Sequence, residues 1–141
     1  GHSHWNNVSI LAAASGRALS IGHSTSIEGL AVMLVGGKCH IGNDCMLSSG
    51  ITIWANDSHR LMDADTGELL NDQPQGVLIG DHCWIGQGAT FTKNAIIPAN
   101  TVVGLQSVVT KSFREEFTVL AGNPAKVIKK GVKWSREREM G

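Results

Sequence analysis

Large hydrophobic residues recur every six positions through most of this chain. In its second half the series runs without a gap through Ile79, Ile85, Phe91, Ile97, Val103 and Val109. A period of six matches neither the 3.6-residue period of a helix nor the simple alternation of a half-buried strand. It is typical of a chain that runs one short strand, turns and repeats, so that three strands complete one coil.

A smaller residue precedes most of these large ones by two positions. In the second half these smaller residues are Cys83, Ala89, Ala95, Thr101 and Ser107. We expect the large side chain to fill the interior of the coil and the smaller one to point inward where space is tight. Glycine and asparagine after the large residue suit the turns, because both tolerate positive φ. The repeat therefore predicts an all-β fold, a parallel β-helix shaped as a triangular prism, in which each coil bonds to the next.

The same rule holds upstream in two other phases. The residues expected to point inward there are Ile21, Ile27 and Met33, followed by Val35, Ile41, Leu47 and Ile53. The phase slips by two between Met33 and Val35, and again between Ile53 and Ile79, where fourteen or twenty residues must leave the prism. We therefore expect a β-helix over residues 19–112 with an inserted loop at about 56–76. Residues 1–18 form an N-terminal segment that is partly derived from a purification tag, and residues 113–141 form a C-terminal extension.

Composition and charge narrow the functional classes. Twelve Lys and Arg residues balance twelve Asp and Glu residues, so the net charge does not indicate nucleic acid or an anionic membrane as a partner. The sequence has no apolar run long enough to span a membrane and no visible signal peptide, so we expect a cytoplasmic protein.

The three cysteines, Cys39, Cys45 and Cys83, fall on the small inward position. We expect them to be buried and free, and to form neither a disulfide framework nor a zinc knuckle.

Three segments carry a resemblance to a known family. They read CHIGNDCMLSSGITIW, VLIGDHCWIGQGATFTKNAIIPANTVVGLQSVVTK and AGNPAKVI. Together with the looped-out NDSH, they resemble the hexapeptide-repeat acyltransferases, and most closely the branch of maltose, galactoside, xenobiotic and capsule or sugar O-acetyltransferases. The resemblance covers about residues 19 to 130. It implies a left-handed parallel β-helix, a homotrimer, acetyl-CoA as the donor, and a sugar or glycan hydroxyl, less often an amine, as the acceptor.

The polar stretch 56–75 opens on the best candidate for catalysis. His59 lies at the root of the loop, where a rigid coil can hold it, and a histidine has the right pKa to act as a general base near neutrality. The family pattern carries the role of general base to His59. For Asp57 two interpretations are open: the carboxylate orients the ring of His59, or it caps the turn.

Trp54 and Trp84 flank inward positions, so both should point outward, where an exposed indole is unusual. They either pack in a trimer or form a wall for the sugar or the pantetheine arm. Trp84, in CWIG, matches a family position near the catalytic histidine, and we assign it to the catalytic site. Trp54 and Asn56 are assigned to the acceptor site, although for Trp54 both interpretations are open.

The family resemblance also implies residues that bind coenzyme A in the groove between two prisms. Backbone groups of successive coils hold the pantetheine arm and basic residues meet the phosphates. The matching positions are Gln87, Leu105, Thr110, Lys111, Lys126 and Lys129.

Two alternatives from other classes remain. A zinc enzyme of the γ-carbonic anhydrase kind shares the fold and holds its metal with three histidines across a trimer interface, and His40, His59 and His82 are the candidates here. The closely spaced histidine pair of that family is absent beyond the first residues, so we expect no metal. A non-catalytic β-helix that serves as a binding module is the second alternative, but it has no reason to keep a polar loop opening on NDSH.

Overall fold

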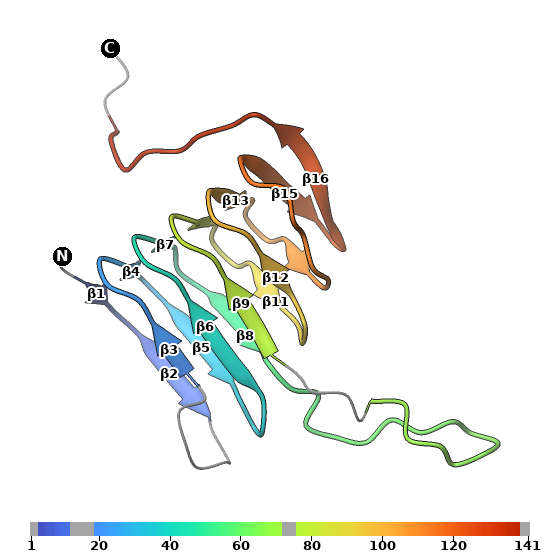
Figure 1. Ribbon diagram of the computed structural model, residues 1–141. Helices are drawn as coiled ribbons and strands as arrows, with labels where there is room; N and C mark the ends of the chain where they lie inside the picture. The colour runs from blue at the N-terminus through green and yellow to red at the C-terminus, as the bar shows by residue number, and fades with distance from the viewer. Residues whose placement is uncertain (1–2, 12–18, 72–75, 139–141) are drawn as a thin grey trace.

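The chain coils into a prism of stacked strands. The computed structural model describes residues 3–11, 19–71 and 76–138, and every regular element among them is a β-strand. Figure 1 shows the coils stacked one on another, from β1 near the N-terminus to a hairpin of β15 and β16. In the described part of the chain, no helix has the length and apolar character needed to cross a membrane.

Three sheets form the faces of the prism. Sheet A contains, in spatial order, β1 (His4–Trp5), β4 (Ser26–Ile27), β7 (Met46–Leu47), β10 (Trp84–Ile85), β13 (Thr101–Val103), β15 (Thr118–Gly122) and β16 (Ala125–Lys130). Sheet B contains β2 (Val8–Leu11), β5 (Leu30–Met33), β8 (Ile51–Trp54), β11 (Thr90–Phe91) and β14 (Val108–Val109). Sheet C contains β3 (Leu19–Ile21), β6 (Lys38–Ile41), β9 (Gly76–Ile79) and β12 (Ile96–Ile97).

The chain visits sheets A, B and C in turn, and every strand pair is parallel except the final hairpin of β15 and β16. We name the edges of the prism by the sheets that meet there: the A–B, B–C and C–A corners. The turns of the chain lie at these corners, so loops and functional side chains are positioned there.

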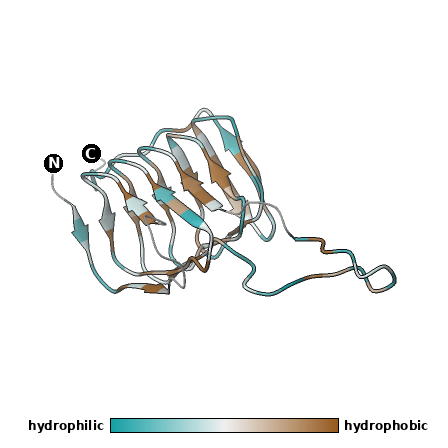
Figure 2. Ribbon diagram, turned by 60° about the horizontal axis from the view of Figure 1, so that its bottom comes forward, coloured by the Kyte–Doolittle hydropathy of each residue, from teal (hydrophilic) through white to brown (hydrophobic). Residues whose placement is uncertain are grey.

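The interior follows the six-residue repeat. Ile27, Leu47, Ile85 and Val103 stand in register on successive strands of sheet A, and all four are buried. In Figure 2 hydrophobic colour appears on strands of several coils and alternates with hydrophilic residues. The expectation that large residues at the period of six fill the core is confirmed for these coils.

The prediction of inward positions is wrong for Met33 and Val35. Val32 and Leu34 are the buried residues of that segment, and Val35 lies in a turn with φ of 26°. The reason is a change in corner length on each side of β5. The A–B corner before β5 is one residue shorter than the next one, and the B–C corner after it is longer, so counting by six loses the phase.

The B–C corner varies most in length. Ile41 pairs with Ile79 across thirty-eight residues, twenty more than one coil of eighteen, so the insertion there has twenty residues. By the same registers, the connection from β5 to β6 is three residues longer than the connection from β11 to β12, and that from β2 to β3 is five residues longer. Three consecutive coils thus carry additional residues at this one corner.

The coils extend beyond residues 19–112 at both ends. Strands β1 and β2 pair in parallel with β4 and β5, and β15 continues sheet A beside β13. His4, in the segment expected to be partly derived from a tag, stands in register with Ser26. After β16, residues 131–138 turn back along the C–A corner, and we call this segment the strap.

The three cysteines lie inside the prism, and two of them, Cys45 and Cys83, belong to a hydrogen-bonded column. All three are free and buried, as expected, and burial raises the pKa of the Cys39 thiol to about 12. Next to the C–A corner, the side chains of Thr25, Cys45 and Cys83 donate to the carbonyl oxygens of Gly42, Gly80 and Pro98. A small donor thus satisfies a corner carbonyl in successive coils, which explains why both threonine and cysteine fit this column.

Candidate active site

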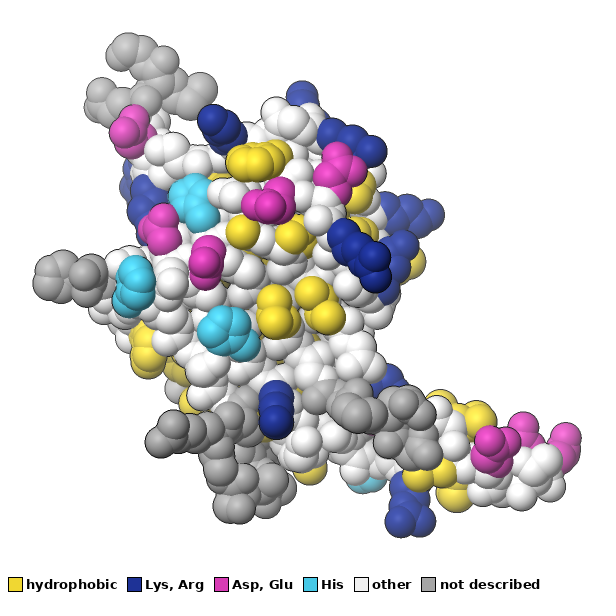
Figure 3. Space-filling view, viewed as in Figure 1, with side chains coloured by type: hydrophobic (Ala, Val, Ile, Leu, Met, Phe, Trp, Pro, Cys, Tyr) yellow, Lys and Arg dark blue, Asp and Glu magenta, His cyan; other side chains and the backbone are white. Residues whose placement is uncertain are grey.

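The insertion after β8 forms an arm, described here over residues 56–71. Its two halves pair: Leu70 N donates to Leu61 O at 2.7 Å, and Met62 bridges to Leu69. The Asp63 carboxylate caps the tip by accepting from the main-chain N–H groups of the turn that follows it. Figures 2 and 3 show the arm projecting from the body of the prism, with acidic side chains at its tip. Its side chains are therefore available for contacts outside this chain.

A tight turn at the root of the arm presents His59. The Asn56 side-chain oxygen accepts a hydrogen bond from Ser58 N at 2.8 Å, and Ser58 has a φ of 71°. This positive φ reverses the chain directly before His59, whose side chain is exposed. Asn56 therefore stabilises the backbone turn that carries His59. A separate role in binding the acceptor remains a proposal.

The carboxylate of Asp57 ties the root of the arm to the prism. It pairs with the ammonium group of Lys93, which lies at the B–C corner of the next coil, and it accepts from Asn71 Nδ2 at 2.8 Å. These two hydrogen bonds, the one from Lys93 first, lower the pKa of Asp57 below its usual value. Together these contacts tie the root of the arm to the coil, which is a different role from the two that the sequence left open for Asp57.

Asn71 joins the two halves of the arm next to His59. Its Nδ2 donates to the main-chain oxygen of His59 at 2.8 Å, and its Oδ1 accepts from Leu61 N at 3.0 Å. Asn71 and Lys93 are not among the predicted site residues. Neither stands on the repeat, and they lie twelve and thirty-four positions from His59, so spacing gives no signal for either residue.

The outer face of sheet B lies beside the root of the arm. Trp54 points outward, as predicted, with 43% of its surface exposed, and stands in register with Met33. Ser9, Ala31 and Thr52 form a floor of small side chains next to them, and together these residues line a shallow hollow of about 200 Å³. The hollow is apolar and open, which suits the flat face of a sugar ring or a pantetheine arm.

Four of the residues expected to bind coenzyme A flank this same face. Gln87 and Leu105 lie at the A–B corner of successive coils, where Gln106 N donates to Gln87 O at 2.8 Å, and Leu105 is 72% exposed. Thr110 and Lys111 lie at the B–C corner of the last coil, on the other side of sheet B. The outer face of sheet B is thus bordered along both edges by predicted donor-binding positions.

Lys126 and Lys129 occupy a different place. Both lie on β16 at the end of sheet A, paired with Ala121 and Val119, and both are exposed. Within one chain they do not border the outer face of sheet B. A role in holding the phosphates of a donor on that face would need a second copy of the chain.

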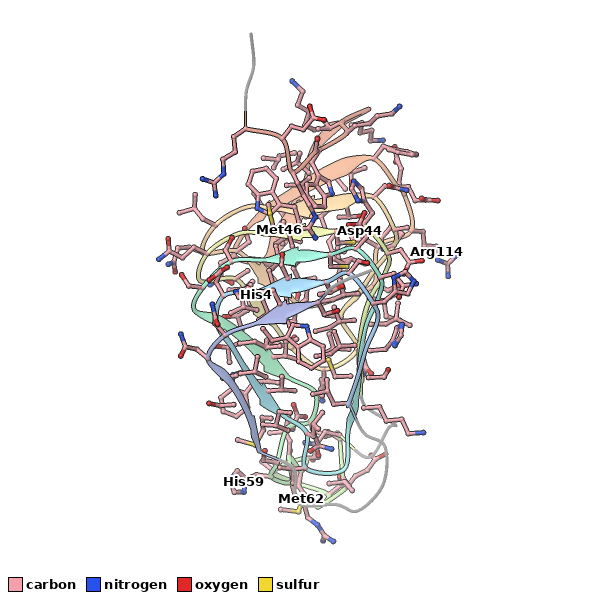
Figure 4. The ribbon with its side chains drawn as sticks, turned by 90° about the vertical axis from the view of Figure 1, so that its left-hand side faces the viewer. His4, Asp44, Met46, His59, Met62 and Arg114 are labelled. Atoms are coloured by element: carbon pink, nitrogen blue, oxygen red, sulfur yellow. The ribbon has the colours of Figure 1, made fainter. Side chains whose placement is uncertain are left out.

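Trp84 lies on sheet A, with 39% of its surface exposed, and stands in register between Met46 and Val102. Figure 4 looks along the prism and places His59 at one end of the cross-section and Met46, the neighbour of Trp84, toward the other. One chain therefore does not bring Trp84 and His59 together.

The strap was not predicted and covers the C–A corner beside Trp84. The indole of Trp134 stacks on His82 with ring centroids 4.2 Å apart and donates from Nε1 to His82 O at 2.8 Å. Arg136 donates to Cys45 O at 2.7 Å and to Ser26 Oγ at 2.9 Å. No repeat marks residues 131–138, so this contact has no signal in the sequence pattern.

The histidines proposed for a metal site lie apart. His40, on the outer face of sheet C, bonds to Ser20 Oγ at 2.6 Å. His82, at the C–A corner, contacts the Asp44 carboxylate through Nδ1 at 2.8 Å and Trp134 O through Nε2 at 3.2 Å. His59 stands on the arm. Among the residues that the structure describes, no three His, Cys, Asp or Glu side chains gather to hold a metal ion.

Comparison with known proteins places this geometry in a family. A scan against models of protein families matches none of them. The structure superimposes on that of the polysialic acid O-acetyltransferase OatWY with a TM-score of 0.84 and 33% sequence identity, covering 96% of this chain and 64% of the other. The chain belongs to the hexapeptide-repeat acyltransferases. The expected all-β, left-handed parallel β-helix of this family is confirmed.

Two curated relatives have the same activity in their names. The polysialic acid O-acetyltransferase of Escherichia coli O1:K1 / APEC is 31% identical over 128 residues, which are 89% of this chain and 41% of the relative. That of Neisseria meningitidis is 43% identical over 101 residues, which are 72% of this chain and 46% of the relative. The chain thus spans a little under half the length of both relatives.

Proposed function

We propose that this chain is the catalytic β-helix of an acetyltransferase that moves an acetyl group from acetyl-CoA to a hydroxyl group of a sugar or glycan. The observation that carries the proposal is His59, exposed on a braced turn beside an open apolar face whose two edges hold the predicted donor-binding positions. The names of the relatives support an O-linked acceptor and a glycan rather than an amine.

His59 acts as the general base in this proposal. Its neutral imidazole takes the proton from the acceptor hydroxyl as that oxygen attacks the thioester carbonyl. A C–O bond forms, the C–S bond breaks, and the proton passes from His59 to the leaving sulfur. A main-chain N–H group of a coil stabilises the oxyanion.

The donor lies along the outer face of sheet B. Main-chain groups at Gln87 and Leu105 pair with the amides of the pantetheine arm, and Thr110 and Lys111 close the opposite edge. The acceptor packs on Trp54 and Met33, on the side of the arm nearer the N-terminus, with Asn56 at its rim. In this arrangement the acceptor hydroxyl and the thioester carbonyl meet next to His59, as transfer between them requires.

The active assembly is a homotrimer. One chain separates His59 from Trp84, Lys126 and Lys129, and closed three-fold symmetry would place sheet A of one copy beside sheet B of the next. The arm exposes Leu61, Met62 and Leu70, which a neighbouring copy can cover.

The decisive experiment is His59→Ala, assayed with acetyl-CoA and a panel of sugars that includes oligosialic acid. The side chain is exposed at the root of a loop, so the variant should fold, show the mass of a trimer by light scattering, and bind coenzyme A as the wild type does. Transfer should fall by roughly 10²–10⁴-fold.

His40→Ala is the matched control, because His40 is also exposed and lies on another face. It should keep near-wild-type transfer. Near-wild-type transfer by His59→Ala, with His40→Ala inactive, would refute His59 as the base. A fully active monomer would refute the shared site.

A further inference from the structure

Asn71 stands where the second half of the arm returns to the prism. Its amide has two N–H donors and one oxygen acceptor. The donors meet the carboxylate of Asp57 and the main-chain oxygen of His59, both at 2.8 Å, and the oxygen meets Leu61 N at 3.0 Å. One side chain therefore bonds on both sides of His59.

The same network reaches the rigid coils through Lys93. The ammonium group of Lys93 pairs with the Asp57 carboxylate, and the backbone of Lys93 belongs to the corner between β11 and β12. A continuous path thus runs from the prism through Lys93, Asp57 and Asn71 to the backbone of His59. A second brace, from Asn56 to Ser58 N, acts on the residue before His59.

We propose that Asn71 is a positioning residue for His59, and that it fixes the backbone from which the imidazole projects. The proposal rests on the function proposed above, in which His59 is the general base. A general base must be held within a fraction of an ångström of the proton it takes, and a loop does not provide this without support. Asn71 supplies the support that a regular strand would otherwise give.

The chemistry requires an amide at this position. Aspartate has the same shape and keeps the acceptor for Leu61 N, but it has no donor for Asp57 or for the His59 carbonyl. Asn71→Asp would also place two carboxylates against each other beside Lys93. The substitution therefore removes the two bonds that matter and leaves the size of the side chain unchanged.

The experiment compares Asn71→Asp with the wild type in the full chain by two kinds of measurement. The first needs no activity: the NMR resonances of the His59 imidazole, and hydrogen exchange at the Leu61 amide. We expect the His59 resonances to shift and Leu61 exchange to accelerate by about tenfold or more. The second is transfer from acetyl-CoA, where kcat should fall by about 10²-fold while the KM for acetyl-CoA stays unchanged.

Two further variants test the path and its specificity. Lys93→Met removes the anchor on the coil and should shift the same His59 resonances with a smaller loss of kcat. Asp63→Ala loosens the tip of the arm, which touches neither His59 nor Asn71, and should leave the resonances and kcat unchanged.

A double-variant cycle separates positioning from general loosening. In a His59→Ala background, Asn71→Asp should cause no further loss of transfer, because its effect passes through His59. An equal loss in both backgrounds, or unshifted His59 resonances in Asn71→Asp, would overturn the proposal. Full activity of His59→Ala would instead contradict the proposed function and with it the catalytic purpose of Asn71, while the resonances would still report the contact.

Discussion

The arm and the strap both depart from the six-residue repeat, but one projects from the prism and the other packs against it. The arm leaves the B–C corner and runs away from the prism, as Figure 1 shows, and Asp57 at its root pairs with Lys93 on the coils. The strap lies back on the C–A corner. Its Trp134 is only 8% exposed, and its Arg136 reaches atoms of the second and third coils.

The difference separates a segment built for stability from one built for access. Trp134 buries a large aromatic surface and makes a hydrogen bond, so the strap holds coils together. The arm leaves Leu61, Met62 and Leu70 exposed. Its side-chain hydrogen bonds lie at its own root and tip. Hydrogen bonds brace the arm where His59 stands, and its apolar side chains are exposed farther out, which suits a segment that meets a substrate or a second copy.

The largest expected effect on stability comes from disrupting the core of the coils, to which both segments are attached. Ile85 is fully buried in the fourth coil, and Ile85→Asp would place an unpaired charge in a packed interior, at a cost of several kcal/mol. We expect loss of soluble protein and of the β-sheet signal in circular dichroism. A soluble, folded Ile85→Asp protein would show that the coil tolerates the charge and that the phase of the repeat matters less than we infer.

Removing the main contact of the strap should cost less. Trp134→Ala loses a buried indole and should lower the free energy of unfolding by about 3 kcal/mol, measured by chemical denaturation. Trp134→Phe keeps the stacking on His82 and loses the Nε1 bond, so about 1 kcal/mol is expected. Unchanged stability of Trp134→Ala would show that the strap, like the arm, does not stabilise the prism.

The smallest effect belongs to the root of the arm and depends on pH. The pKa of Asp57 is lowered from 3.8 in the folded chain, so its pairing stabilises the fold above that pH and the contribution disappears as the pH falls through the folded value. The pair is partly exposed, so we expect at most about 1 kcal/mol. The stability difference between wild type and Asp57→Asn should therefore shrink as the pH is lowered below about 4. A difference that grows in acid would contradict the ion pair with Lys93.

Most of the prism could be predicted from the sequence, because each six-residue step places one large residue inside. The prediction failed at Met33 and Val35, where one corner loses a residue and the next gains three. A period alone cannot tell which residues of an altered corner keep their inward direction. The ambiguity between fourteen and twenty inserted residues had the same cause, and strand register resolves it to twenty.

The site was predictable only where it touches the repeat. His59 was placed by the motif at the end of a coil, and the outward direction of Trp54 and Trp84 followed from the alternation along their strands. Asn71 and the strap depend on how non-repeating segments fold back. Side-chain hydrogen bonds determine those paths, and such bonds leave no periodic trace in the sequence.

The variable length of the B–C corner has a consequence for how acceptor preference can be changed. Three neighbouring coils absorb five, three and twenty additional residues there, and the strands resume their register each time. A new segment can therefore be grafted at the tip of the arm, between Met62 and Leu69, without replacing His59 or Asn71 and without displacing the corners that hold Gln87 and Leu105. The coils keep their register whatever length of chain leaves the B–C corner, so recognition of the acceptor can be redesigned independently of the donor.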